Sequence, residues 1–353
     1  MKYKKWVESV ERVRGDRDSR FDKLRLDKNE RLSNFDGSFW KDVISKITQE
    51  HILAYPEVEP LYERLARFLG RTQDNIVITA GSDFAIKIAF ELFVNPGDKV
   101  VYLDPTFAMV DVYCGLYRAE RAKIGYNTNL EADISGLSTA IDESVSLIVI
   151  ANPNSPTGTY IPNDTLSSIV LKAGSYGIPV LVDEAYYGFC PYTALDILDE
   201  HPNLMVTRTF SKTAGLAGLR IGYIVAQPNL AALLYKFRPM YEVNSIAVLF
   251  MAELMDHWHI VEEYIRATAE GKQYLLSGLE ALSIKTIDTL TNFIHADFGT
   301  RRTGVLDAFR KDGILVRGSL PVKGFEGYSR ISVGTVAEME ILLASIRRNY
   351  GVR

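Results

Sequence analysis

The chain has few of the residues that build disulfide frameworks and metal centres. Its 353 residues include two cysteines and five histidines, and there is neither a His-Glu-x-x-His motif nor a pair of closely spaced cysteines. We therefore expect no disulfide framework and no bound metal. His257 and His259 stand two positions apart in a helical stretch, and because this spacing places them on different helix faces, we do not expect them to share a metal.

Long apolar runs and an excess of one charge are also missing. No run approaches the roughly 20 apolar residues that cross a bilayer, and a formal net charge of −4 gives no electrostatic reason to expect nucleic-acid binding. Residues 1–27 are rich in charged side chains and lack the apolar core of a secretory signal. We expect a cytoplasmic protein with small-molecule substrates and with neither nucleic acid nor membrane as partner.

Walker motifs, dinucleotide-binding fingerprints and internal repeats are absent as well, and the pattern that is present is an alternation of strands and helices. Strand-like apolar runs occupy residues 76–79, 100–103, 147–151 and 180–182. Helical or loop segments separate them, which predicts βαβ units and a mainly parallel central sheet. The chain is long for one compact unit, so two domains are expected.

Helical periodicity is expected on both sides of this alternating region. It covers residues 39–52 and 58–69, which meet at Tyr55-Pro56. A second, largely helical stretch covers residues 230–282, and short strands and helices are mixed from there to the C-terminus. The sequence therefore predicts an α/β protein with additional helices around its central sheet.

The most informative segment surrounds a single lysine. It reads Arg208-Thr209-Phe210-Ser211-Lys212-Thr213-Ala214-Gly215-Leu216-Ala217-Gly218-Leu219-Arg220. The amine of Lys212 can form a Schiff base, while hydroxyls, backbone N–H groups and Arg220 hold an anion. This combination suits pyridoxal 5′-phosphate (PLP), which carries an aldehyde and a phosphate. The competing interpretation is a Gly/Ala turn with a solvated lysine.

A second segment supplies a carboxylate. The apolar run at residues 178–182 ends at Asp183, which is typical of a buried parallel strand whose carboxyl end faces a ligand. Asp183 beside the pyridine nitrogen of PLP would favour its protonated form. Tyr186, three residues on, can donate a hydrogen bond to the ring's phenolic oxygen. The alternative is that Asp183 caps the next helix.

A turn of small residues offers a site for the phosphate. Gly81-Ser82-Asp83 lies between the strand at residues 76–79 and a helical run at 84–93, so its backbone N–H groups and the helix dipole favour an anion. The residues that we assign to the phosphate are Ser82, Asp83 (through its backbone N–H), Thr209, Ser211 and Arg220. A plain helix N-cap is the alternative for the turn.

The order of these and other motifs resembles the fold-type I PLP aminotransferases of classes I and II, most of all the histidinol-phosphate aminotransferase group. The resemblance runs from about Leu26 to the C-terminus. Its further motifs are Leu26-Asp27-Lys28-Asn29-Glu30, Ala54-Tyr55-Pro56, Asp104-Pro105-Thr106-Phe107, Asn152-Pro153-Asn154-Ser155-Pro156-Thr157-Gly158, Thr291-Asn292-Phe293, Gly313-Ile314-Leu315-Val316-Arg317 and Arg330-Ile331-Ser332-Val333-Gly334-Thr335. Each motif is weak alone, and their joint order is specific.

The resemblance implies a mainly parallel sheet flanked by helices, plus a smaller α+β domain. The large PLP-binding domain would cover residues 31–240, and residues 1–30 and 241–353 would form the small domain. Tyr55 matches a tyrosine that relatives extend across a dimer interface to the phosphate, which implies a homodimer with active sites at the interface. Phe107 matches the aromatic residue that stacks on the pyridine ring, although it could equally be a core phenylalanine.

The resemblance also implies a substrate pocket. Arg330 matches the arginine that pairs with the substrate carboxylate, Arg317 would be a second anion site or a surface charge at a strand end, and Asn29 belongs to a segment that contributes to the pocket. Two departures affect this region. Ser155 stands where relatives usually carry the asparagine that contacts the ring oxygen, and Asn29-Glu30-Arg31 replaces the usual Asn-Glu-Asn-Pro, which leaves the substrate open.

The implied activity is amino transfer between L-glutamate/2-oxoglutarate and a small phosphorylated amine in amino-acid biosynthesis. Histidinol phosphate and imidazole acetol phosphate are the leading pair, with Lys212, Asp183 and Tyr186 as catalytic groups. Three alternatives stay open: a PLP-dependent decarboxylase of the threonine-phosphate type, an aminotransferase for aromatic or other amino acids, and a PLP-sensing regulator. The regulator is disfavoured because its DNA-binding domain would have to precede the resemblance that begins at about Leu26.

Overall fold

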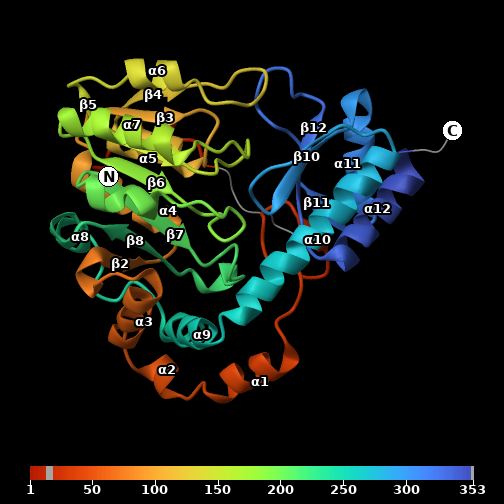
Figure 1. Cartoon of the computed structure of the whole chain (residues 1–353), viewed down its shortest axis with the longest axis horizontal. Helices are drawn as coiled ribbons and strands as arrows, with labels where there is room; N and C mark the ends of the chain where they lie inside the picture. Colours follow the sequence, from red (N-terminus) through yellow and green to blue (C-terminus); the bar gives the residue numbers. More distant parts are fainter. Residues whose placement is uncertain (13–18, 351–353) are drawn as a thin grey trace.

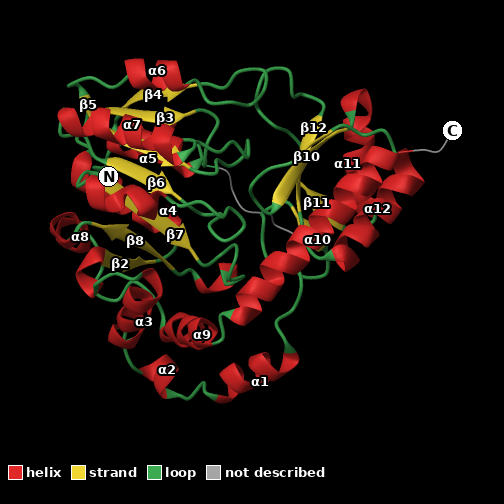
Figure 2. Cartoon of the chain, viewed as in Figure 1, coloured by secondary structure: helices red, strands yellow, loops and turns green. Residues whose placement is uncertain are grey.

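The computed structural model describes residues 1–12 and 19–350 and has two parts (Figures 1 and 2). The larger part is a seven-stranded sheet with helices on both faces. The smaller part gathers short strands against the helices α10 (His259–Ala281), α11 (Arg302–Lys311) and α12 (Val336–Tyr350). This is the α/β architecture that the sequence predicts, with a mostly parallel central sheet flanked by helices.

The central sheet has the strand order β2-β8-β7-β6-β5-β3-β4. Its strands are β2 (Ile76–Thr79), β3 (Lys99–Leu103), β4 (Glu120–Ile124), β5 (Val145–Ala151), β6 (Val180–Asp183), β7 (Leu204–Thr209) and β8 (Gly222–Ala226). The four strands predicted from apolar runs are found within two residues of their expected bounds. Strand β8 runs antiparallel to both of its neighbours, β2 and β7. The connection from β7 to β8 covers residues 210–221 and contains the lysine segment and the short turn η4 (Ala217–Leu219).

Alternate residues of each strand face the two helical layers, as the period-2 geometry of a strand requires. One layer consists of α4 (Ser82–Phe93), α5 (Met109–Tyr117) and α8 (Pro228–Tyr235). The other contains α3 (Glu59–Leu69), α6 (Ile134–Thr139), α7 (Asn163–Ser175), η3 (Ala194–Glu200) and α9 (Ser245–Asp256). In β2, for example, Val77 packs with the first layer and Ile76 and Ile78 with the second.

The smaller part joins the two ends of the chain. Strand β1 (Leu24–Leu26) pairs in parallel with β11 (Ile314–Val316), and β12 (Tyr328–Ser332), β10 (Phe293–Asp297) and β9 (Thr286–Ile287) form an antiparallel sheet. The helices α10 (His259–Ala281), η5 (Gly299–Arg301), α11 (Arg302–Lys311) and α12 (Val336–Tyr350) complete it. The fully buried Leu26 packs in one apolar cluster with Leu275, Ile331 and Leu342, so the N-terminal strand is part of this core.

The predicted domain limits, residues 31–240 for the large domain and 1–30 with 241–353 for the small one, stay a prediction. Residues 13–18 and 351–353 lie outside the described part of the chain. Within that part, the buried side chains of α9 such as Met251 belong to the apolar cluster of the central sheet, as does Val261 at the start of α10. Leu275, further along α10, belongs to the smaller cluster.

The two long helical stretches predicted from periodicity are each divided. Residues 39–52 form part of α1 (Gly37–Ser45) and of α2 (Glu50–Leu53). Residues 230–282 are shared by α8, α9 and α10. The break before α9 has a clear local cause, because the Asn244 side chain accepts a hydrogen bond from the Ala247 N–H at 2.8 Å and so caps a new helix.

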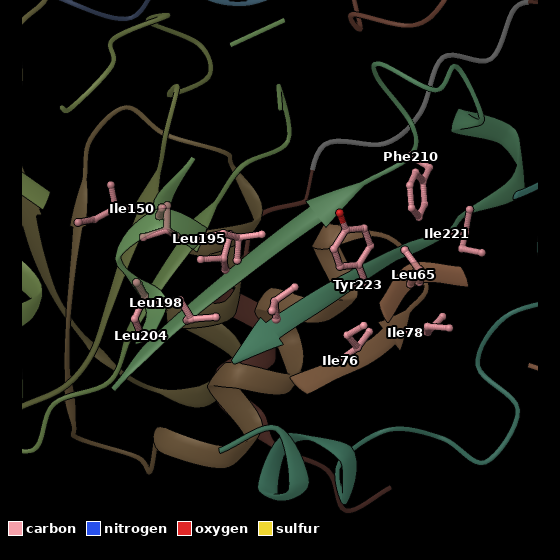
Figure 3. Packing of buried hydrophobic residues seen from close by; sticks show 14 of the residues in the cluster. Leu65, Ile76, Ile78, Ile150, Leu195, Leu198, Leu204, Phe210, Ile221 and Tyr223 are labelled. Atoms are coloured by element: carbon pink, nitrogen blue, oxygen red, sulfur yellow. The ribbon is translucent and has the colours of Figure 1, made fainter. Parts of the chain in front are cut away.

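Aromatic packing supports the end of β7, where the lysine segment begins. Figure 3 shows Phe210 and Tyr223 beside each other at strands β7 and β8, with their ring centroids 5.3 Å apart. Both side chains are buried, and Phe210 directly precedes Ser211 and Lys212. The segment that follows β7 is therefore anchored on a rigid core. Among residues 1–12 and 19–350, no helix combines the length and apolarity needed to cross a membrane.

Candidate active site

The predicted site residues gather at the carboxyl ends of β6 and β7 and at the start of α4. Asp183 is the last residue of β6, Thr209 is the last residue of β7, and Ser82 begins α4. Lys212 follows β7 after two residues. Since the carboxyl ends of parallel strands form the ligand-binding edge of an open α/β sheet, the topology brings these side chains to one place.

Asp183 is a carboxyl group held almost out of contact with water. Its residue is 4% exposed, and its Oδ1 has no hydrogen-bond partner among the described residues. Burial raises the pKa of Asp183 to about 7, although the Ser82 hydroxyl acts in the opposite direction. A buried carboxylate without a counter-charge is costly, so Asp183 is suited to pair with a cationic group such as a protonated pyridine nitrogen.

Lys212 lies close to this carboxyl group. Its Nζ donates to the backbone oxygen of Lys28 at 2.7 Å, which ties the lysine to the N-terminal segment. Desolvation is the main cause that lowers the pKa of Lys212 to about 8, and the positive charge of Arg330 lowers it further. A substantial fraction of the amine is thus neutral near physiological pH, as attack on an aldehyde and proton abstraction both require.

The residues predicted to hold the phosphate surround the first turn of α4. The Thr209 hydroxyl donates to Ser211 Oγ at 2.9 Å, and Arg220 Nη1 donates to the same oxygen at 3.2 Å. Arg220 Nη2 also donates to the Ala80 backbone oxygen at 3.4 Å. Hydroxyls, a guanidinium and the open end of a helix therefore converge, which is an arrangement that binds phosphate.

Glycine and Asp83 complete this turn. Gly81 has φ = 84°, and a Cβ atom there would lie 2.9 Å from Arg220 Nη2, so a side chain would displace the guanidinium. The carboxylate of Asp83 accepts a hydrogen bond from the hydroxyl of Tyr113 at 2.9 Å and therefore points toward helix α5. The carboxylate is therefore engaged away from the turn, and the role of the Asp83 backbone N–H toward the phosphate stays a prediction.

Tyr186 and Asn29 are joined by a hydrogen bond, and Asn29 directly follows Lys28, whose backbone oxygen binds Lys212. Tyr186 is 3% exposed, and its hydroxyl accepts from Asn29 Nδ2 at 2.7 Å. The Tyr186 ring packs edge-on against Phe293, with the centroids 5.5 Å apart. A residue of the N-terminal segment and a residue after β6 thus share one hydrogen bond although 157 positions separate them.

Arg330 and Ser155 are also brought together. Arg330 Nη1 donates to Ser155 Oγ at 3.0 Å, Nη2 donates to the Asp27 backbone oxygen at 2.7 Å, and Nε has no partner among the described residues. Burial lowers the pKa of Arg330, and the positive charge of Arg317 acts in the same direction. The guanidinium therefore retains donor capacity for an anionic ligand.

Asn154 does not take the place of the family's asparagine. It is fully buried, its Oδ1 accepts from the Thr106 hydroxyl at 2.6 Å, and its Nδ2 donates to Thr157 Oγ1 at 2.8 Å and to the Pro105 oxygen at 3.0 Å. Both ends of its amide are used, by Thr157 of its own loop and by Pro105 and Thr106 of the loop after β3. Ser155 is consequently the polar side chain of this pair that faces Arg330.

Three predicted residues lie at the margin of this cluster. Arg317 follows β11 and is joined to Arg330 by two backbone hydrogen bonds of 3.1 and 3.2 Å, so two arginines stand side by side. Phe107 is partly buried against the apolar layer of α4 and α5. Tyr55 is 72% exposed and stacks on Tyr241 with a centroid separation of 4.0 Å.

A buried ion pair beneath the site was not predicted. Arg208 Nε donates to Glu184 at 2.9 Å, both residues are 3% exposed, and the Arg208 guanidinium lies 3.3 Å from the centroid of the Tyr187 ring. The Thr213 hydroxyl donates to the Tyr187 backbone oxygen. These contacts fasten the segment carrying Asp183 to the one carrying Lys212. A charged residue in the otherwise apolar and threonine-rich strand β7 is the signal that would have indicated it.

A second unpredicted acid supports the phosphate turn. Glu242 accepts a hydrogen bond from the Ala80 N–H at 2.6 Å, and its Oε2 has no partner among the described residues. Burial raises the pKa of Glu242 to about 7, with Arg238 and Lys87 acting against this shift. No group of three or more His, Cys, Asp or Glu residues within the described ranges is placed to hold a metal ion.

Comparison with known proteins agrees with this geometry. The profile of the family described as Aminotransferase class I and II matches residues 33–346. A histidinol-phosphate aminotransferase of Dehalococcoides mccartyi is 33% identical over 327 residues, which cover 92% of this chain and 89% of the relative. One from Thermoanaerobacter pseudethanolicus is 32% identical over 329 residues and 92% of both proteins. The crystal structure of histidinol-phosphate aminotransferase from Sinorhizobium meliloti in complex with pyridoxal-5′-phosphate has a TM-score of 0.83 and 26% identity, covering 91% of this chain and 89% of that one.

A buried carboxyl group with an unpartnered oxygen and a desolvated lysine, at the ligand-binding edge of this sheet, are what a PLP-dependent enzyme requires. The chain belongs to the aminotransferase class I and II family. The predicted resemblance, the fold-type I architecture, PLP as the cofactor and transamination as the activity are thereby confirmed. The residues present fit the cofactor, because Asp183 Oδ1 lacks a partner and the turn at Gly81 leaves helix N–H groups for a phosphate.

Proposed function

We propose that this protein is a histidinol-phosphate aminotransferase, which exchanges an amino group between L-glutamate/2-oxoglutarate and histidinol phosphate/imidazole acetol phosphate. The observation that carries the proposal is a pair of neighbouring arginines, of which Arg330 lies close enough to Lys212 to lower the pKa of the lysine. Arg330 keeps a free Nε, and Arg317 is joined to it through the backbone. Two anion-binding groups suit an enzyme that alternates between a substrate with a carboxylate and one with a phosphate. The names of the relatives support the same pair of substrates.

The proposed cofactor site follows from the same contacts. Lys212 would bind the aldehyde, Asp183 would face the pyridine nitrogen, and Tyr186 would face the phenolic oxygen. Phe107 would cover the ring and Ser155 would lie near the substrate side of it. Ser82, the Asp83 N–H, Thr209, Ser211 and Arg220 would hold the phosphate.

The reaction needs a base at the substrate Cα. When bound, PLP supplies an electron sink for the pair of electrons that remains at Cα once the proton has left. Lys212, with a pKa lowered to about 8, would take up this proton and would later give it back within the site. Asp183 would favour the protonated form of the pyridine nitrogen, and Arg330 would orient the substrate through its carboxylate.

The experiment that tests this function is a visible absorption spectrum before and after addition of L-glutamate. Conversion of the PLP band to that of the pyridoxamine form is expected. The ratio of kcat/KM for histidinol phosphate to that for histidinol should then exceed ten, because the phosphate would occupy the second anion site. Release of carbon dioxide would instead identify the decarboxylase, and an equal kcat/KM for histidinol would favour an enzyme for non-phosphorylated amines.

We further propose a cytoplasmic homodimer with active sites at the interface. Apolar side chains that are exposed in the single chain gather at residues 52–55 and 240–241, where the stacked Tyr55 and Tyr241 hold two segments together. Leu53 is 79% exposed and Met240 is 77% exposed. A second copy of the chain would cover this surface, and Tyr55 would then extend to the phosphate site of the partner.

A further inference from the structure

Asn29 has an unusual place in the molecule. It is 1% exposed and has φ = 56°, in the left-handed region that asparagine tolerates better than most residues. Its backbone oxygen accepts from Asn292 Nδ2 at 3.2 Å. Its backbone N–H and both ends of its side-chain amide are also bonded within the protein, to Ser332 and Tyr186. Asn29 therefore has little capacity left for a substrate.

The hydrogens of this network have a defined direction. The Asn29 N–H donates to Ser332 Oγ at 2.9 Å, and the single hydroxyl hydrogen of Ser332 donates to Asn29 Oδ1 at 2.7 Å. If the amide were turned over, Ser332 would face two N–H donors and its own hydrogen would lose this acceptor. Oδ1 therefore faces Ser332, and Nδ2 donates to the Tyr186 hydroxyl at 2.7 Å.

This direction has a consequence for Tyr186. Its oxygen already accepts a hydrogen from Asn29, so the hydroxyl hydrogen has to point elsewhere. No other hydrogen bond of the Tyr186 hydroxyl is formed within the described residues. In the proposed cofactor site, the group on the open side of this hydroxyl is the phenolic oxygen of PLP.

We propose that Asn29 is a positioning residue that orients the Tyr186 hydroxyl so that its hydrogen is donated to the phenolic oxygen of PLP. This role rests on the proposed placement of the cofactor and replaces the assignment of Asn29 to substrate binding. Ser332 ends β12 and Asn292 directly precedes β10, so both partners that orient Asn29 come from the smaller part of the molecule. The direction of the Tyr186 hydrogen is thus set by the smaller part of the molecule.

The variant Asn29→Asp tests the direction, because a carboxylate accepts but does not donate and would take the Tyr186 hydrogen for itself. The measurement is the pH midpoint of the visible band of the PLP-loaded enzyme, without substrate. We expect Asn29→Asp and Tyr186→Phe each to raise the midpoint by roughly one pH unit. The reason is that a phenolic oxygen deprived of its donor holds the nearby proton on the Lys212 nitrogen more strongly.

The double variant separates orientation from the added charge. If Asn29 acts through Tyr186, Asn29→Asp will raise the midpoint less in the Tyr186→Phe background than in the wild type, and the difference will equal the shift caused by Tyr186→Phe alone. Shifts that simply add would mean that the carboxylate acts by its charge, and this would overturn the proposal. If the wild type formed no visible band with PLP, the proposed cofactor site itself would be wrong.

Ser332→Ala provides a second test that leaves residue 29 and its charge unchanged. Without the hydroxyl hydrogen, the Asn29 amide is free to turn over, so a smaller rise of the midpoint is expected, and none in the Tyr186→Phe background. An unchanged midpoint in Ser332→Ala would contradict the proposal. The thermal midpoint of each apo-variant reports whether the fold is retained, and Ser332→Ala remains informative if Asn29→Asp fails to fold.

Discussion

At the scale of single residues, the site contains two ionisable groups whose charged forms are disfavoured by desolvation. Asp183 has an oxygen without a partner, and Lys212 has a pKa well below that of a solvated lysine. Each group lowers the stability of the protein without its cofactor and favours binding of the cofactor. A protonated pyridine nitrogen would stabilise the carboxylate, and an aldehyde would consume the neutral amine.

Replacing Lys212 by alanine removes the proposed base and the attachment point of the cofactor. We expect transamination to fall by at least 10³-fold, since general acid–base catalysis alone contributes roughly 10²–10⁴-fold. Steady-state rates with L-glutamate and 2-oxoglutarate measure the effect, and Lys311→Ala, at the exposed end of α11, is the matched control. Near-normal turnover in Lys212→Ala would refute the assignment.

Asp183→Asn should separate stability from catalysis. Folding raises the pKa of Asp183 from its usual 3.8 to about 7, because burial disfavours the charged carboxylate. The protonated carboxyl group therefore contributes its full share to the free energy of unfolding below pH 3.8. This contribution is lost as the pH rises through about 7. Such a shift is worth up to roughly 4 kcal/mol. The apo-variant should therefore be more stable than the wild-type apoenzyme at pH 8, as measured by urea unfolding, while its kcat falls more than its affinity for PLP.

Equal stability of the two apoenzymes at pH 8 would show that Asp183 is better solvated than its burial indicates. A kcat close to that of the wild type would remove the electron-sink role from Asp183. The two measurements address different properties, so either one can fail alone.

Glu242 should produce a second pH effect on stability. Its pKa is raised from 4.5 to about 7 by burial, so the fold loses stability as the pH rises across this interval. Arg238, Lys87 and the hydroxyl of Tyr62 are the ionisable groups that interact with it. In Glu242→Gln, the thermal midpoint of the apoenzyme should decline less between pH 5 and pH 7.5 than in the wild type. Parallel declines in the two proteins would contradict this expectation.

The chemistry of individual residues was more predictable than their partners. Asp183, Lys212 and Arg220 could be recognised because a charged residue beside an apolar strand or among small residues needs a ligand. The hydrogen bond from Arg330 to Ser155 and the one from Asn29 to Tyr186 join residues more than 150 positions apart. Local patterns carry no information about such pairs, which tertiary packing decides.

At the scale of elements, strand periodicity located most of the central sheet. It did not predict the antiparallel strand β8 or the positions at which the long helical stretches are divided. The direction of β8 shows only in its antiparallel pairing with β2 and β7, and the start of α9 depends on one capping asparagine. Periodicity reports which face of an element is buried, and it does not report where the chain reverses.

Gly271 in α10 should be far less replaceable than Gly304 in α11. A Cβ atom on Gly271 would overlap the backbone of Gly334 and Thr335, whereas nothing lies within 4 Å of a Cβ on Gly304. We expect Gly271→Ala to reduce the free energy of unfolding by roughly 1–3 kcal/mol and Gly304→Ala to change it little or to raise it by up to about 1 kcal/mol. Urea unfolding of both variants measures the contrast, and equal effects would mean that α10 can shift away from β12.

At the scale of the whole molecule, the exposed apolar surface at residues 52–55 and 240–241 predicts how the enzyme assembles. Leu53→Glu places a charge in this surface and should convert the proposed dimer to monomers in analytical ultracentrifugation, with a loss of activity of at least tenfold. Leu171, on α7 and 67% exposed, is the control position, and Leu171→Glu should leave mass and activity unchanged. A dimer that persists in Leu53→Glu would place the interface elsewhere.

The pairing of β1 with β11 has a consequence for synthesis in the cell. Leu24 pairs with Ile314, so β1 is synthesised early in translation and can pair only after β11 has been synthesised. The central sheet is complete once β8 has left the ribosome, but Asn29 and Arg330 meet their neighbours only after the last strands have followed. A chain that terminates after β8 therefore contains the whole central sheet but lacks a complete active site. Each new molecule becomes catalytically competent only after its last strands have been synthesised.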